Sequence, residues 1–159
     1  MSERDNAGVI APPPLVFVAA ILAAWGMEQV APFGWLASLA GPVRWVMAAV
    51  LIVLGLGLMG AAISGFSRAG TAVQTRSPST ALVTTGVYSF ARNPIYLGFF
   101  CILIGIAIAA AWDWLLIFAL VFLAIIHWGV VRREERYLTA KFGDVYTAYI
   151  QRVRRYGLF

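Results

Sequence analysis

The sequence predicts an all-α polytopic membrane protein with about four transmembrane helices and a C-terminal cytoplasmic amphipathic helix. Hydrophobic residues make up 62% of the 159 residues and charged residues only 12%. Soluble domains are about half apolar and about a quarter charged, so lipid is the expected solvent for this chain. The length is that of one domain, and we expect a single unit over residues 1–159.

Four apolar runs are long enough to cross a bilayer. They cover roughly 14–30, 45–63, 95–111 and 115–131. A hydrocarbon core of about 30 Å needs about 20 residues per helix, with about 17 as the lower end. Only Trp112, Asp113 and Trp114 separate the last two runs, which predicts a tight helical hairpin with aromatic rings at the interface.

The basic residues indicate how the helices are oriented. One precedes the first run, three lie in the loop 64–93, seven follow Val131, and Arg44 alone falls on the opposite side. Because Lys and Arg concentrate on the cytoplasmic side of membrane proteins, both termini and the loop 64–93 are predicted to be cytoplasmic.

The tail from Arg132 onward is predicted to continue as a helix out of the fourth span. Its apolar and aromatic residues, at the spacing of one helical face, are Leu138, Phe142, Tyr146 and Tyr149. Two interpretations stay open for this amphipathic helix: an anchor on the membrane surface, or a cover over the cytoplasmic mouth of the bundle.

Polar residues near this exit are candidates for chemistry. Glu134 follows His127 by seven residues, nearly two helical turns, so the two side chains are predicted to point the same way, with Glu135 one step round. The functional interpretation is a carboxylate that binds a polar or cationic ligand, and the alternative is a solvated charge cluster. One histidine and the lone Cys101 provide no recognised metal-ligand set, so no metal is expected.

A second candidate segment is 86–98, which precedes and begins the third run. Gly86 permits a turn, and Pro94 favours the start of a helix. Free backbone N–H groups at that start, together with Arg92, are expected to attract a carboxylate.

Small residues recur at three- and four-residue spacing in the second run: Gly55, Gly57, Gly60, Ala61 and Ser64. Close helix packing is one explanation. The alternative is a site where a ligand approaches the backbone.

These two segments carry a family resemblance. Residues 86–98 resemble the G-x-Y-x-x-x-R-H/N-P-x-Y-x-G signature of the isoprenylcysteine carboxyl methyltransferase and phospholipid (phosphatidylethanolamine) methyltransferase superfamily. A second block is similar to the C-terminal pattern of that superfamily, and it consists of His127, Glu134, Glu135, Leu138, Phe142, Gly143, Tyr146, Tyr149 and Val153. The resemblance extends from about Arg68 to Arg155 and implies a single transmembrane methyltransferase domain with its cofactor site in 86–98 and 127–155.

The resemblance implies S-adenosylmethionine as methyl donor, with S-adenosylhomocysteine as product. No G-x-G-x-x-G after a strand is present, so no Rossmann domain is expected. By position, the implied cofactor-binding residues are Tyr88, Arg92, Asn93, Pro94, Tyr96, Leu97, Gly98, His127, Glu134 and Glu135. The implied catalytic residues are His127, Glu135 and Arg92, of which His127 or a glutamate would take a proton from an amine acceptor.

The implied acceptor is lipophilic: an aminophospholipid headgroup, an isoprenylcysteine-like carboxylate, or a small hydrophobic thiol or amine. We expect membrane lipid as a partner, no nucleic acid, and a bacterial inner membrane location. Asn93 stands where many members have histidine, Arg136 where proline is common, and Gly55-Leu56-Gly57 only weakly matches a G-x-G of the phospholipid branch. A non-catalytic scaffold or lipid-binding subunit is the alternative function, and a transporter is disfavoured because no mid-membrane polar groups or repeated halves are evident.

Overall fold

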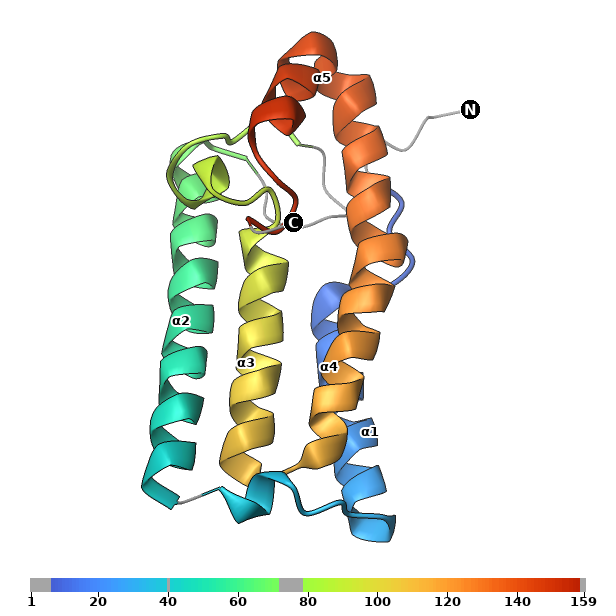
Figure 1. Ribbon diagram of the computed structural model, residues 1–159. Helices are drawn as coiled ribbons and strands as arrows, with labels where there is room; N and C mark the ends of the chain where they lie inside the picture. The colour runs from blue at the N-terminus through green and yellow to red at the C-terminus, as the bar shows by residue number, and fades with distance from the viewer. Residues whose placement is uncertain (1–6, 40, 72–78, 158–159) are drawn as a thin grey trace.

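The computed structural model describes residues 7–39, 41–71 and 79–157 (Figure 1). The helices are α1 (Pro13–Val30), α2 (Gly41–Arg68), α3 (Pro94–Ala110), α4 (Asp113–Ile126) and α5 (Arg132–Arg152). Two short 3₁₀ turns, η1 (Leu36–Ser38) and η2 (Gly86–Ser89), lie in the loops, and a π turn, η3 (His127–Val131), joins α4 to α5. The described residues form no strand, which confirms the predicted all-α class.

Among the described residues, three helices are long and apolar enough to cross a membrane: α1, α2, and α4 with its continuation into α5. The fourth, α3, is apolar but has 17 residues, the lower limit for a span. The first and third predicted runs agree with α1 and α3 to within one residue, whereas α2 is longer than the predicted run 45–63 at both ends. The difference arises because apolarity marks the part of a helix that lies in lipid, and α2 continues past it. The chain is an integral membrane protein.

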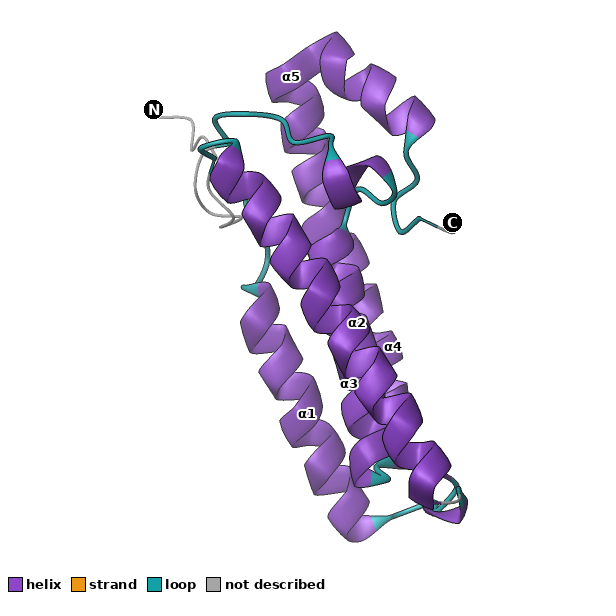
Figure 2. Cartoon of the chain, turned by 90° about the vertical axis from the view of Figure 1, so that its left-hand side faces the viewer, coloured by secondary structure: helices purple, strands orange, loops and turns teal. Residues whose placement is uncertain are grey.

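The four spanning helices pack in the order α2, α3, α4, α1 (Figures 1 and 2). Their closest approach joins α2 to α3, where a Cβ added to Gly98 would lie 2.7 Å from the carbonyl oxygen of Gly55. Small residues allow such backbone contact between membrane helices. Close packing therefore explains Gly55, whereas a Cβ added to Gly57 or Gly60 would meet nothing within 4 Å.

At the end of the bundle opposite α5, the carboxylate of Asp113 links the start of α4 to the loop between α1 and α2. The side chain of Asp113 is buried and accepts hydrogen bonds from the backbone N–H groups of Trp35 at 3.0 Å and Leu36 at 2.9 Å. Ala111 adopts a left-handed conformation (φ 55°) between α3 and α4. These contacts confirm the predicted tight hairpin and tie it to the loop between α1 and α2.

The fourth spanning helix continues past its apolar run into α5 as predicted, but with two irregularities. The π turn η3 contains one residue more per turn than an α-helix. Every side chain after it is therefore rotated about the helix axis by about 100° relative to its direction in a regular α-helix. The backbone N–H of Ile10 donates to the carbonyl of Gly129 within this turn at 3.2 Å. Further on, Gly143 (φ 52°, ψ −126°) interrupts α5, and the remainder of the helix folds back over the ends of the other helices (Figure 2).

Candidate functional site

A cavity lies at the end of the bundle that carries α5. The residues that line it come from the end of α2, the loop before η2, η2 itself, the start of α3, and α5. The segment before α1 and the residues between η2 and α3 also contribute. The lining residues are Ala7, Phe66, Ser79, Ala81, Leu82, Val83, Tyr88, Arg92, Asn93, Pro94, Ile95, Tyr96, Glu134, Glu135, Tyr137, Leu138, Tyr146 and Tyr149. Both candidate segments of the sequence therefore meet around one cavity.

Glu134 occupies the wall of this cavity that α5 provides. It lies three residues beyond Val131, the last residue of the spanning segment, and its Oε1 accepts a hydrogen bond from the hydroxyl of Tyr96 at 2.9 Å. Desolvation by burial raises the pKa of Glu134 from 4.5 to about 7, although the hydrogen bond from Tyr96 acts in the opposite direction. The carboxyl group thus changes its charge near neutral pH.

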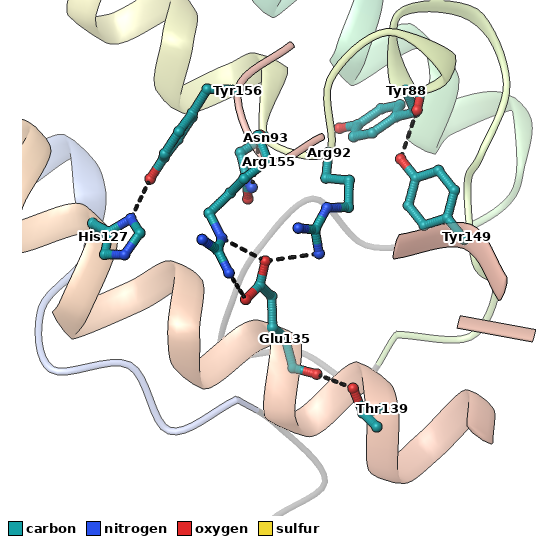
Figure 3. Close-up of polar contacts among 9 residues, drawn as sticks. All are labelled: Tyr88, Arg92, Asn93, His127, Glu135, Thr139, Tyr149, Arg155 and Tyr156. Atoms are coloured by element: carbon teal, nitrogen blue, oxygen red, sulfur yellow. Dashed lines mark hydrogen bonds and ion pairs between the residues drawn. The ribbon is translucent and has the colours of Figure 1, made fainter. Parts of the chain in front are cut away.

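Glu135 faces a different set of partners and binds two guanidinium groups (Figure 3). Arg92 approaches its Oε1 at 2.9 Å, and Arg155 contacts both carboxylate oxygens at 2.8 Å. Such bidentate pairs are strong and directional, and the hydrogen bond to Glu135 raises the pKa of Arg155. The side chain of Arg92 is only 11% exposed, and its Nε is buried without a hydrogen-bond partner among the described residues.

The C-terminal segment after α5 closes over the start of α3. The backbone N–H of Arg92 donates to the carbonyl of Arg154 at 3.0 Å, and both the backbone N–H and the side-chain amide of Asn93 donate to the carbonyl of Arg155 at 3.1 Å. The expectation of free N–H groups at this start is therefore wrong for residues 92 and 93. The chain's own C-terminal segment accepts those hydrogen bonds.

Tyrosines form much of the remaining wall. The hydroxyl of Tyr149 donates to the carbonyl of Tyr88 at 2.6 Å (Figure 3), which fastens α5 to η2. Burial raises the pKa of Tyr146 to about 12 and raises those of Tyr88 and Tyr149 further above 10. These hydroxyls therefore stay neutral at physiological pH. The sequence places Tyr146 and Tyr149 on a helix face and in the C-terminal block that resembles the superfamily, but neither is predicted from it to bind the cofactor.

His127 lies differently from its predicted position. Its Nδ1 is 3.1 Å from the hydroxyl of Tyr156, and it does not line the cavity (Figure 3). The prediction that His127 and Glu134 share one stripe assumed a regular α-helix. Because of the rotation that the π turn introduces, Glu135, eight residues after His127, points to the same side of the helix as His127. Glu134 points to a different side.

The structure brings together seven of the ten residues that the family resemblance implies for the cofactor. Tyr88, Arg92, Asn93, Pro94, Tyr96, Glu134 and Glu135 line the cavity, whereas Leu97, Gly98 and His127 do not. Gly98 lies in the contact with α2 instead. Arg155 is not among the predicted site residues, because in the sequence it is one of several basic residues that indicate the orientation of the spans. No spacing in the sequence indicates that the C-terminal segment returns to α3.

Comparison with known proteins identifies a family for this chain. The profile of the family described as "Phospholipid methyltransferase" matches residues 43–145, which extend from α2 into α5. No curated protein and no solved structure matches the chain. The matched region covers more than half of the chain and contains residues 86–98 and the part of the second block that runs from His127 to Gly143. The protein therefore belongs to the phospholipid methyltransferase family, and methyl transfer is the general activity which that membership implies.

Proposed function

We propose that the cavity binds S-adenosylmethionine and that the protein transfers its methyl group to a lipophilic acceptor at the cytoplasmic face of the membrane. The observation that carries this proposal is the charge of the cavity wall. Among the described residues it contains two carboxylates, Glu134 and Glu135, and one guanidinium, Arg92. S-adenosylmethionine carries the complementary set, an amino group and a sulfonium as cations and one carboxylate as an anion.

Individual atoms of the wall also suit this ligand. The buried Nε of Arg92 has no partner among the described residues, and buried donors of this kind are expected to have one. A ligand carboxylate would satisfy it. The carboxylate of Glu134 would bind the amino group or the ribose hydroxyls, and the tyrosine rings offer π faces to a sulfonium.

When bound, S-adenosylmethionine supplies an electrophilic methyl group. The residues of the chain then have mainly to align this group with the acceptor and exclude water. In the alternative in which Glu134 contacts the ribose hydroxyls, its raised pKa of about 7 suits it to take a proton from an amine acceptor near neutral pH. Paired with the cofactor amino group, Glu134 would stay ionised and would serve only to hold the cofactor. Glu135 has both oxygens engaged by guanidinium groups, so we assign it to positioning Arg92 instead of proton transfer.

The cytoplasmic location rests on the asymmetry of basic residues: of the Lys and Arg residues that the structure describes, all but Arg44 lie toward the end of the bundle that contains the cavity. The acceptor candidates are an aminophospholipid headgroup and an isoprenylcysteine-like carboxylate. Membership of the phospholipid methyltransferase family favours the first of these.

Calorimetric titration of the detergent-solubilised protein with S-adenosylmethionine and S-adenosylhomocysteine tests the proposal. Binding should be lost or strongly weakened by Glu134→Gln and by Arg92→Gln. The matched controls are Asp144→Asn and Arg152→Gln, which alter exposed charges on α5 that do not line the cavity.

Transfer of labelled methyl groups to extracted lipids or to prenylcysteine analogues would then identify the acceptor. A wild-type protein that binds neither cofactor form would favour the alternative of a non-catalytic membrane scaffold. Unchanged binding in both cavity variants would refute the assigned site.

A further inference from the structure

A second concave surface lies on the other side of the Arg92–Glu135 pair. We call it the arginine groove. The described residues that line it are Arg92, Trp128, Arg132, Glu135, Arg136, Thr139, Ala140, Tyr146, Ile150 and Arg155. Because Arg92, Glu135 and Tyr146 also line the first cavity, the two spaces share one wall of side chains.

The charge of the arginine groove is opposite to that of the first cavity. Four arginines line it against a single carboxylate, and that carboxylate, Glu135, is already shared by Arg92 and Arg155. Arg132 and Arg136 are exposed on consecutive turns of α5, and the Nε of Arg136 donates to the carbonyl of Arg132 at 3.3 Å. Within the described part of the chain, neither of these two guanidinium groups has a carboxylate partner. The groove therefore suits an anionic ligand.

The groove begins at the level expected for lipid phosphates. The 14 residues of α4 and the five of the π turn extend for about 28 Å, close to the thickness of the hydrocarbon core. Arg132 follows directly, and Trp128, one turn earlier, is 61% exposed where an interfacial aromatic ring is expected. A guanidinium group at this level is well placed for bidentate contact with phosphate oxygens.

We propose that the arginine groove binds the phosphodiester group of a membrane phospholipid. This inference deepens the proposed function and rests on it in one respect: the bound lipid is the methyl acceptor, whose headgroup extends past the shared wall toward the first cavity. The groove also gives a role to Arg136, where the sequence departs from the proline that is common in the superfamily.

Binding measurements without cofactor test the groove directly. Short-chain phosphatidylethanolamine and phosphatidylglycerol are titrated into the protein in an uncharged detergent, beside diacylglycerol of the same chain length and water-soluble glycerol phosphate. Both phospholipids should bind at least about tenfold more tightly than the other two compounds. Arg132→Gln combined with Arg136→Gln should weaken phospholipid binding by about tenfold or more, because each charge-assisted hydrogen bond to phosphate is lost. Arg152→Gln, on the exposed part of α5, is the matched control.

S-adenosylhomocysteine binding separates this inference from the proposed function. The double variant should keep that binding unchanged, and in a transfer assay it should raise the apparent KM for lipid with little change in kcat. Equal binding of diacylglycerol, or undiminished phospholipid binding by the double variant, overturns the groove assignment even if the cofactor binds. Glycerol phosphate binding as tightly as the lipids would assign the groove to a soluble phosphate and overturn the lipid assignment.

Discussion

Glu134 should make cofactor binding depend on pH. Its carboxyl group lines the proposed cofactor cavity, and burial raises its pKa to about 7. A protonated Glu134 cannot pair with a cationic amino group, so only the ionised fraction of the protein is competent to bind. The apparent Kd then increases by a factor of about 11 at pH 6 and about 2 at pH 7, and it is nearly unperturbed at pH 8. Affinity should therefore rise about tenfold between pH 6 and pH 8.

Isothermal titration with S-adenosylhomocysteine at constant ionic strength would measure this dependence. The Glu134→Gln variant should bind weakly and with little change across the same pH range. Asp144→Asn should retain the wild-type slope, since Asp144 is exposed and does not line the cavity. A flat profile for the wild type, or a persistent tenfold slope in Glu134→Gln, would refute the assignment of Glu134 to the cofactor amino group.

The same carboxyl group should make the ligand-free protein less stable as the pH rises, whereas it makes cofactor binding tighter. Because its pKa is raised in the folded, ligand-free protein, Glu134 holds a proton more tightly there than in the unfolded chain. Its contribution to stability is full below the unfolded pKa of 4.5 and is lost as the pH rises through about 7. The Tm in detergent should therefore show a component that falls between pH 5 and pH 8 and is absent from Glu134→Gln.

Three further substitutions test the packing and the charge network. Gly98→Ala should lower the free energy of unfolding by about 1–3 kcal/mol, because the added methyl group would lie 2.7 Å from a backbone oxygen of α2. Gly57→Ala is the control: its methyl group would meet no atom within 4 Å, so this variant should be neutral or slightly stabilising. A loss of cofactor binding without loss of stability in Gly98→Ala would instead support the cofactor role implied by the family resemblance. Glu135→Gln should lower the Tm and weaken S-adenosylhomocysteine binding, because it leaves two guanidinium groups without their shared carboxylate. Asp113→Ala should cost about 1–3 kcal/mol in thermal unfolding but spare cofactor binding, since its two backbone hydrogen bonds lie at the opposite end of the bundle.

The sequence was sufficient for the membrane architecture because hydrophobic length is a property of local composition. The four runs, the hairpin at Trp112–Trp114 and the helical tail all appear in the structure. The same holds for the start of α3, where Pro94 is the first helical residue. Each of these features depends on residues that are neighbours in the chain.

Features that depend on distant contacts were not predictable in this way. Arg155 reaches Glu135 only because Gly143 turns α5 back and the C-terminal segment then pairs with the backbone of residues 92 and 93. Because Arg152 and Arg154 lie beside it in the sequence, Arg155 is interpreted from the sequence only as another basic residue that marks the cytoplasmic side. The packing role of Gly98 was equally hidden, since the signature that includes this residue does not show which helix lies against it.

The π turn explains how two adjacent glutamates come to have different partners. Neighbouring residues on a helix point about 100° apart, so Glu134 and Glu135 cannot face the same group. In a regular α-helix Glu134 would follow the direction of His127, toward Tyr156 and the C-terminal segment. The extra residue in η3 rotates α5 so that Glu135 takes that side and meets Arg155, while Glu134 turns to Tyr96. A single inserted residue in the helix backbone thus directs one carboxylate to the network that fixes Arg92 and leaves the other available to the cavity.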